Sequence, residues 1–122
     1  MTVNNYTFPM TVERVIDGDT IVGIVDVGFR VSLTLPLRIY GMDAPEMSTM
    51  EGKVATSALI DLIGWAPTHH PLLVVKTHAP GTNAGADKFG RWLGEVQLPD
   101  GTDLASRMIA DGHARPYFGG AR

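Results

Sequence analysis

The sequence lacks cysteine altogether, has few aromatic residues and contains no long apolar run. Without cysteine, the chain can form neither disulfides nor thiolate zinc sites. No stretch approaches the roughly 18 apolar residues that suggest a bilayer-spanning helix, so we expect no membrane association. Residues 1–9 have neither the basic segment nor the apolar core of a secretory signal. Because the sequence begins with methionine, we expect a complete cytoplasmic chain, with export as the alternative.

The charge is modest: 10 basic and 13 acidic residues give a net charge of −3. Domains that bind nucleic acid by charge alone are usually basic, so this balance argues mildly against that class. It is compatible with an enzyme whose acids hold a cation. The length of 122 residues and the hydrophobic fraction of 44% are typical of one folded domain. We therefore expect a single, monomeric domain over 1–122, with a loose N-terminal segment at 1–9 and a flexible tail at 118–122.

The hydrophobic pattern predicts a β-rich α+β chain. Apolar positions alternate with polar ones, or are β-branched, in five predicted strands, which are 10–16, 20–27, 29–40, 72–77 and 92–98. Pro36 indicates an edge or a bulge in the third strand.

Two helices complete the pattern. Ser48 and Glu51 have the spacing of a capping box, and the helix that follows is expected to end at Gly64. A shorter helix near the C-terminus would be capped by Thr102 or Asp103. Five strands with a helix inserted after the third is the order of a five-stranded OB-type barrel.

Asp17-Gly18-Asp19-Thr20 interrupts the first strand pair. The plain interpretation is a hairpin turn, because Asp-Gly between two strands is a strong turn signal. A second carboxylate at Asp19 brings repulsion with Asp17 unless a cation or a donor lies nearby. The motif is therefore also a candidate ligand site.

The stretch 37–46 combines Arg38 with two acids, Asp43 and Glu46, at a break marked by Gly41 and Pro45. A strand exit with a local side-chain turn would explain Asp43 alone. Hard divalent cations prefer oxygen ligands, and a guanidinium can bind phosphate through two parallel hydrogen bonds. An ion pair on the strand is the alternative role for Arg38.

A third charged motif, Asp87-Lys88-Phe89-Gly90-Arg91, precedes the last predicted strand. It is either a charged strand start or the source of a second guanidinium. The four histidines fit no zinc spacing. Taken together, the acids and arginines have the composition of a metal-assisted phosphodiester-cleaving site, in which a carboxylate activates water and arginines neutralise the developing charge.

These three motifs, followed by Leu104-Ala105 and Gly112-His113-Ala114, resemble the staphylococcal nuclease (thermonuclease) family over about residues 10–117. The resemblance implies an OB-type barrel and Ca²⁺-dependent cleavage of DNA and RNA at the 5′-oxygen, leaving 3′-phosphates. Its implied roles are calcium ligation by Asp19, Asp43 and the Ala44 carbonyl, phosphate binding by Arg38 and Arg91, and base catalysis by Glu46. Asp17 and Thr20 would support the metal site, and Lys88 and Tyr117 would contact substrate.

Two residues depart from the family pattern. Ala44 stands where threonine is common, and Phe89 stands where tyrosine can occur, so two hydroxyl groups are missing. Because Asp19, Arg38, Asp43, Glu46 and Arg91 are all present, the sequence favours an active nuclease. The alternatives are an inactive OB-type module that binds nucleic acid or protein, and an unrelated protein-interaction domain that leaves the charged set unexplained.

Overall fold

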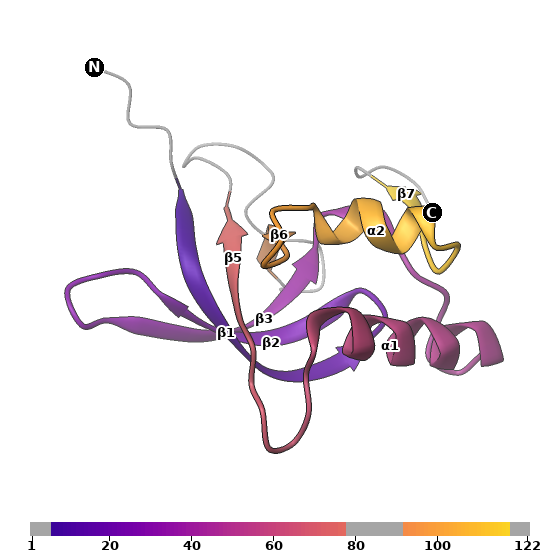
Figure 1. The fold of residues 1–122 in the computed structure, drawn as a ribbon, viewed down its shortest axis with the longest axis horizontal. Helices are drawn as coiled ribbons and strands as arrows, with labels where there is room; N and C mark the ends of the chain where they lie inside the picture. Colours follow the sequence, from indigo (N-terminus) through magenta and orange to yellow (C-terminus); the bar gives the residue numbers. More distant parts are fainter. Residues whose placement is uncertain (1–5, 78–91, 118–122) are drawn as a thin grey trace.

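A computed structural model describes residues 6–77 and 92–117 of the chain. Five strands close into a barrel in the order β1-β2-β3-β6-β5, and a two-stranded sheet, β4-β7, lies beside it (Figure 1). The strands are β1 (Thr7–Asp17), β2 (Thr20–Asp26), β3 (Ser32–Ile39), β4 (Gly41–Asp43), β5 (Leu72–Lys76), β6 (Trp92–Gln97) and β7 (Arg115–Tyr117). The helices are α1 (Met50–Ile63) and α2 (Leu104–Ala110). The predicted OB-type α+β architecture is confirmed.

The barrel closes because β1 is long enough to pair with two neighbours. Its first part, from Thr7 to Thr11, runs antiparallel to β5, and from Met10 onward it also pairs with β2, through two register shifts. Such shifts bend a strand and increase its twist. β1 begins at Thr7, three residues before the predicted strand, because its first residues pair with β5. The prediction of a loose segment at 1–9 is therefore wrong for residues 7–9.

The β2–β3 hairpin extends away from the barrel and ends in a tight turn at its far end (Figure 1). The backbone N–H of Val27 donates to Val31 O at 3.0 Å. Between them, Phe29 and Arg30 have positive φ angles of 55° and 60°, which are uncommon for residues other than glycine. β3 consequently starts at Ser32 rather than at Phe29.

Pro36 lies where β3 gains its second neighbour. Before it β3 pairs with β2 alone, and from Leu37 onward it also runs parallel to β6. The register passes through Pro36 without a bulge. A proline there costs no hydrogen bond on the open side, so the edge interpretation is correct.

The apolar core fills the barrel and the space under both helices, with Met10, Ile21, Ile39, Leu59 and Leu104 among its buried members. Thr49, not Ser48, caps α1, since its Oγ1 accepts from the N–H of Gly52 at 3.0 Å. The cap therefore lies one residue after the predicted one, and because Gly52 has no side chain to reach back, the predicted capping box with Glu51 is not formed. Gly64 ends α1 and Asp103 caps α2, both as predicted. Neither helix is both long and apolar enough to cross a membrane.

Candidate active site

The Asp17–Thr20 segment is both a hairpin turn and part of the site. Asp17 pairs with Thr20 at the end of the β1–β2 ladder, and the N–H of Asp19 donates to Asp17 Oδ1 at 3.1 Å. A Cβ on Gly18 would lie 2.8 Å from the Cβ of Ala44 and 3.0 Å from that of Ala55. The turn can therefore pack closely against α1 and the residue after β4 only with glycine at this position.

Arg38 joins the two acids that the sequence placed in different motifs. Its Nη2 lies 3.1 Å from Asp43 Oδ1 and 3.7 Å from Asp19 Oδ2, and it donates to the Met42 carbonyl at 3.3 Å. Arg38 is 4% exposed, and the two acids are 6% exposed each. Buried charges persist when they are paired and hydrogen-bonded, and this cluster satisfies that requirement.

Backbone and side-chain donors hold Asp19 in place. Its Oδ1 accepts from the Thr20 hydroxyl at 3.1 Å, and its Oδ2 accepts from the Ala44 N–H at 3.1 Å. Its carbonyl accepts from the N–H of Ile39 at 2.9 Å. Asp19 is thus tied to β3 through its carbonyl and to the segment after β4 through its carboxylate, and the Thr20 hydroxyl holds the other carboxylate oxygen. A supporting role of Thr20 at a metal site stays a prediction.

The β4–β7 sheet brings a residue that sequence reasoning missed. Arg115 lies directly opposite Asp43 in the antiparallel pairing. Its Nε and Nη2 donate to Asp43 Oδ2 at 3.3 and 3.2 Å. Opposite charges at facing positions of an antiparallel pair stabilise it. The available signal was a basic residue close after the Gly112-His113-Ala114 motif, but nothing local indicated its partner.

Tyr117 also comes from β7, and it covers the buried arginine. The Cζ atom of Arg38 lies 4.9 Å from the centre of the Tyr117 ring, within the range of a cation–π interaction. In this structure the half-buried Tyr117 contacts the site itself. Contact with substrate remains a prediction for this residue.

Glu46 lies at the edge of an open pocket of about 540 Å³. The pocket is lined by Asp43, Ala44, Pro45, Glu46, Gly112, His113, Ala114 and Arg115. Glu46 itself is exposed, whereas Asp43 is buried. A solvent-facing carboxylate beside a buried one can meet a water molecule in the pocket, so the geometry allows Glu46 to act on water.

Burial raises the pKa of Asp17, and the Asp19 carboxylate adds to this by side-chain hydrogen bonding and by repulsion, whereas the hydrogen bond from the Asp19 N–H lowers it. A half-buried acid next to a fully buried one therefore loses some of its preference for the charged form. Nearby positive charge comes from Arg38 and Arg115.

The donor chemistry fits a hard cation. Two buried carboxylates lie against the same guanidinium nitrogen, and the Ala44 carbonyl is adjacent in the chain. Calcium binds six to eight oxygens, including carboxylates, carbonyls and water, so carbonyl and water oxygens would have to complete the set. Within residues 6–77 and 92–117, no group of three or more His, Cys, Asp or Glu side chains is placed to hold a metal.

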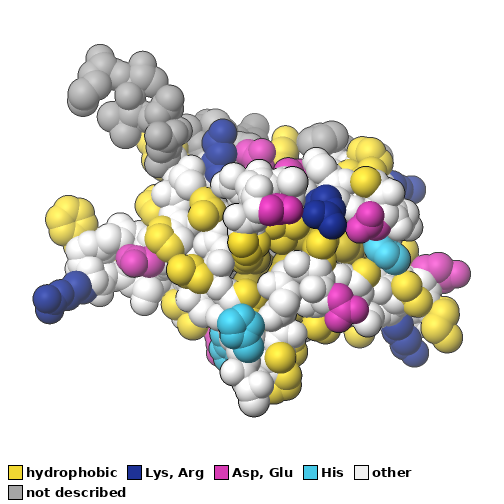
Figure 2. All heavy atoms as spheres, viewed as in Figure 1, with side chains coloured by type: hydrophobic (Ala, Val, Ile, Leu, Met, Phe, Trp, Pro, Cys, Tyr) yellow, Lys and Arg dark blue, Asp and Glu magenta, His cyan; other side chains and the backbone are white. Residues whose placement is uncertain are grey.

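Part of the predicted site is not described. Asp87, Lys88, Phe89 and Arg91 lie outside the described residues, so the second arginine remains a prediction. On the face in Figure 2, acidic and basic side chains are interspersed, and the described residues there form no continuous basic patch.

A five-stranded barrel with buried carboxylates paired to a buried arginine at one end of a hairpin defines an OB-type domain with an acid–arginine site. The family model described as "Staphylococcal nuclease homologue" matches residues 36–121. The chain belongs to this family, as its sequence motifs indicated.

A named relative agrees with this assignment. An uncharacterized endonuclease of Escherichia coli O157:H7 is 31% identical over 106 residues, which make up 87% of this chain and 59% of that protein. The chain thus spans about three-fifths of the length of this relative.

Proposed function

We propose that this domain is a Ca²⁺-dependent nuclease that hydrolyses phosphodiester bonds in DNA, RNA or both, at the 5′-oxygen, leaving 3′-phosphates. The observation that best supports it is the meeting of Asp19 and Asp43 on one buried arginine, beside a pocket edged by Glu46. Membership of the nuclease family adds to this support. The E. coli relative, which is longer, is named an endonuclease.

In this proposal, Asp19, Asp43 and the Ala44 carbonyl hold Ca²⁺. When bound, Ca²⁺ supplies polarisation of a phosphoryl oxygen. Thr20 fixes the Asp19 carboxylate by donating to Oδ1, and Asp17 fixes its backbone by accepting the Asp19 N–H. These contacts hold the ligand oxygens in place before substrate arrives, which reduces the cost of reorganisation.

Glu46 is the proposed general base. Its exposed carboxylate would accept a proton from the attacking water, a role that contributes typically 10²- to 10⁴-fold in rate. Arg38 and Arg91 would neutralise the charge that develops on the phosphate. Because Nη2 of Arg38 faces the acids, its phosphate contact would use its other N–H groups. Lys88 and Tyr117 are proposed to contact the nucleic acid.

The test is cleavage of end-labelled single-stranded DNA and RNA by the purified chain, with Ca²⁺ or with EGTA. We expect fragments with 3′-phosphate ends only when Ca²⁺ is present. Asp19→Asn is the matched negative control, because it removes one charge while keeping the shape of the side chain. Circular dichroism confirms that both proteins are folded. A folded protein that cleaves neither substrate with Ca²⁺ would contradict the proposal.

The second candidate is an inactive OB-type module that binds nucleic acid or protein. The same samples separate it from the first. Retarded migration of intact DNA in a gel, with no cleavage at any Ca²⁺ concentration, is the result that this alternative predicts.

A further inference from the structure

Asp43 is held by two arginines that differ in burial. The side chain of Arg38 is 5% exposed and reaches Oδ1, whereas the side chain of Arg115 is 70% exposed and reaches Oδ2. Arg38 also donates to the Met42 carbonyl, and this second hydrogen bond holds its side chain in place. Arg115 reaches the acid from the opposite strand and can swing into solvent at little cost.

Arg115 occupies the oxygen that a cation would use. A carboxylate oxygen has two lone pairs, and Oδ2 of Asp43 accepts from both Nε and Nη2 of Arg115. Oδ1 already accepts from Arg38. A cation that binds Asp43 through Oδ2 must therefore displace at least one of the Arg115 hydrogen bonds.

We propose that Arg115 is a displaceable counter-ion of Asp43, which competes with Ca²⁺ for this carboxylate. Arg115 holds the acid in the metal-free protein and leaves Oδ2 when the cation enters. This inference rests on the proposed calcium site. It makes Arg115 a positioning residue that sets the calcium concentration at which the site fills.

Once displaced, Arg115 remains beside the chemistry. It lines the same pocket as Glu46, together with His113 and Ala114. Its guanidinium then adds positive charge to the pocket at the moment when the acids have been neutralised. Arginine suits this exchange because its fork forms two parallel bonds with a carboxylate and equally with a phosphate.

The experiment is calorimetric titration of Ca²⁺ into the wild-type chain and into Arg115→Gln and Arg115→Lys at low ionic strength. We expect Arg115→Gln to bind Ca²⁺ about two- to tenfold more tightly, which is the size expected for losing a partly exposed ion pair and one nearby positive charge. The calcium affinity of Arg115→Lys should lie between these two, since lysine keeps the positive charge but cannot form both guanidinium hydrogen bonds to Asp43.

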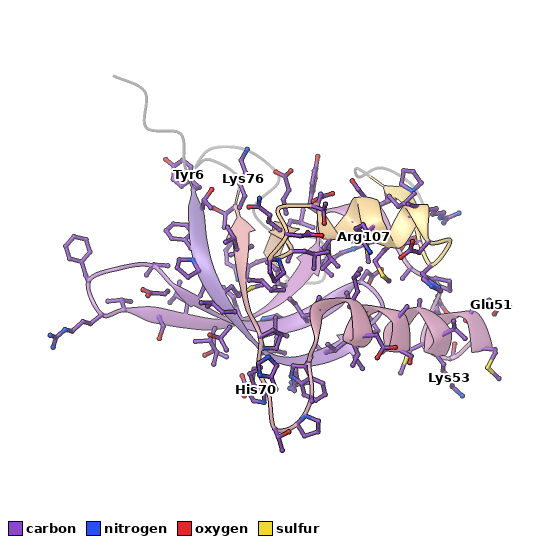
Figure 3. All side chains as sticks on the ribbon, in the orientation of Figure 1. Tyr6, Glu51, Lys53, His70, Lys76 and Arg107 are labelled. Atoms are coloured by element: carbon purple, nitrogen blue, oxygen red, sulfur yellow. The ribbon has the colours of Figure 1, made fainter. Side chains whose placement is uncertain are left out.

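Arg107→Gln is the matched control. Arg107 lies on α2 (Figure 3) and pairs with Asp100 at 3.7 Å with a 41% exposed side chain. The Arg107→Gln variant loses the same positive charge, but at a place that does not contact Asp43. Its calcium affinity should therefore equal that of the wild type. Thermal unfolding in EGTA gives a second readout, in which Arg115→Gln should unfold at a lower temperature than the wild type.

Two results would overturn the inference, and they differ in meaning. If the wild type binds Ca²⁺ and Arg115→Gln binds it equally, more weakly, or with the same shift as Arg107→Gln, Arg115 does not compete for Asp43. If no variant binds Ca²⁺, the proposed calcium site fails and this inference fails with it.

Discussion

Nη2 of Arg38 lies 3.1 Å from Oδ1 of Asp43, and both residues are almost fully buried. Removing one partner from such a pair leaves the other charge without compensation, which typically costs about 3–5 kcal/mol. Net stabilities of small domains are about 5–15 kcal/mol. The pair is therefore a condition for the fold as well as a part of the site.

Arg38→Met should lower the free energy of unfolding by about 3 kcal/mol, because Asp19 and Asp43 would both lose their buried counter-ion. Urea unfolding in EGTA measures this change. Adding Asp43→Asn in the same background should recover part of the loss, since it removes one of the two buried charges that lost Arg38 as a partner. A loss below about 0.5 kcal/mol, the range of ordinary surface substitutions, would show that the pair contributes little.

Glu46→Gln should lower kcat about 10²- to 10⁴-fold and leave the binding of a short oligonucleotide nearly unchanged. Glu46 is exposed, so the free energy of unfolding should stay within about 0.5 kcal/mol of the wild type. Glu51→Gln is the matched control, since Glu51 is another exposed glutamate and lies on the first turn of α1 (Figure 3). Lost binding with unchanged kcat would remove Glu46 from the role of base.

Gly52→Ala tests how α1 supports Glu46. In a helix, alanine is usually more stable than glycine by about 1 kcal/mol. Here its Cβ would clash with the Glu46 carbonyl oxygen, a backbone atom that cannot turn aside. We expect a net loss of about 1–3 kcal/mol, as for overpacked cores, together with a lower kcat.

Gly64→Ala provides the comparison for Gly52→Ala. At Gly64 a Cβ would have nothing within 4 Å, but φ is +77°, so only backbone strain acts. It should cost about 1 kcal/mol of stability and leave kcat unchanged. If Gly52→Ala stabilised the protein, the close approach to Glu46 would not exist in solution.

Asp100→Asn gives a pH dependence that is independent of the site. Hydrogen bonds from the Thr102 hydroxyl and N–H, at 2.6 and 3.0 Å, lower the pKa of Asp100 below its ordinary value of 3.8, and Arg107 adds a smaller effect. The folded state therefore favours the carboxylate. Its contribution to stability is present above pH 3.8 and is lost as the pH falls through the lower folded-state pKa.

The urea midpoint of Asp100→Asn should accordingly lie below that of the wild type near neutral pH. The two midpoints should converge in acid, once the wild-type carboxyl is protonated. A difference that stayed constant down to the lowest pH would assign the effect to the changed hydrogen bonds rather than to the charge.

The order of the strands and helices followed from sequence because period and turn residues are local signals. The cap of α1 was misplaced by one residue, since Ser48 and Thr49 are both good caps and only the fold decides between them. Arg38 was expected to bind phosphate because of its planar guanidinium and the family resemblance, with an ion pair as the alternative. The structure places it in buried ion pairs with Asp19 and Asp43, against the ring of Tyr117.

The partner of Asp43 could not be predicted in the same way. Asp43 and Arg115 are 72 positions apart, and their contact depends on the register of β4 with β7. The hydrophobic pattern of neither segment indicates which residues pair between the two strands. The family motifs assigned Asp19 and Asp43 to one site, and the structure brings both acids against Arg38. The motifs carried no information about a residue outside them.

The β2–β3 hairpin separates two ends of the molecule: Thr20 pairs with Arg38 at one end, and Asp26 pairs with Ser32 at the other. Phe29, at the far turn, is fully exposed, and the chain has no cysteine. Phe29→Cys would therefore give one reactive thiol for attaching a fluorophore or a solid support. Such a label would report on or immobilise the domain while its chemistry at the opposite end stays untouched.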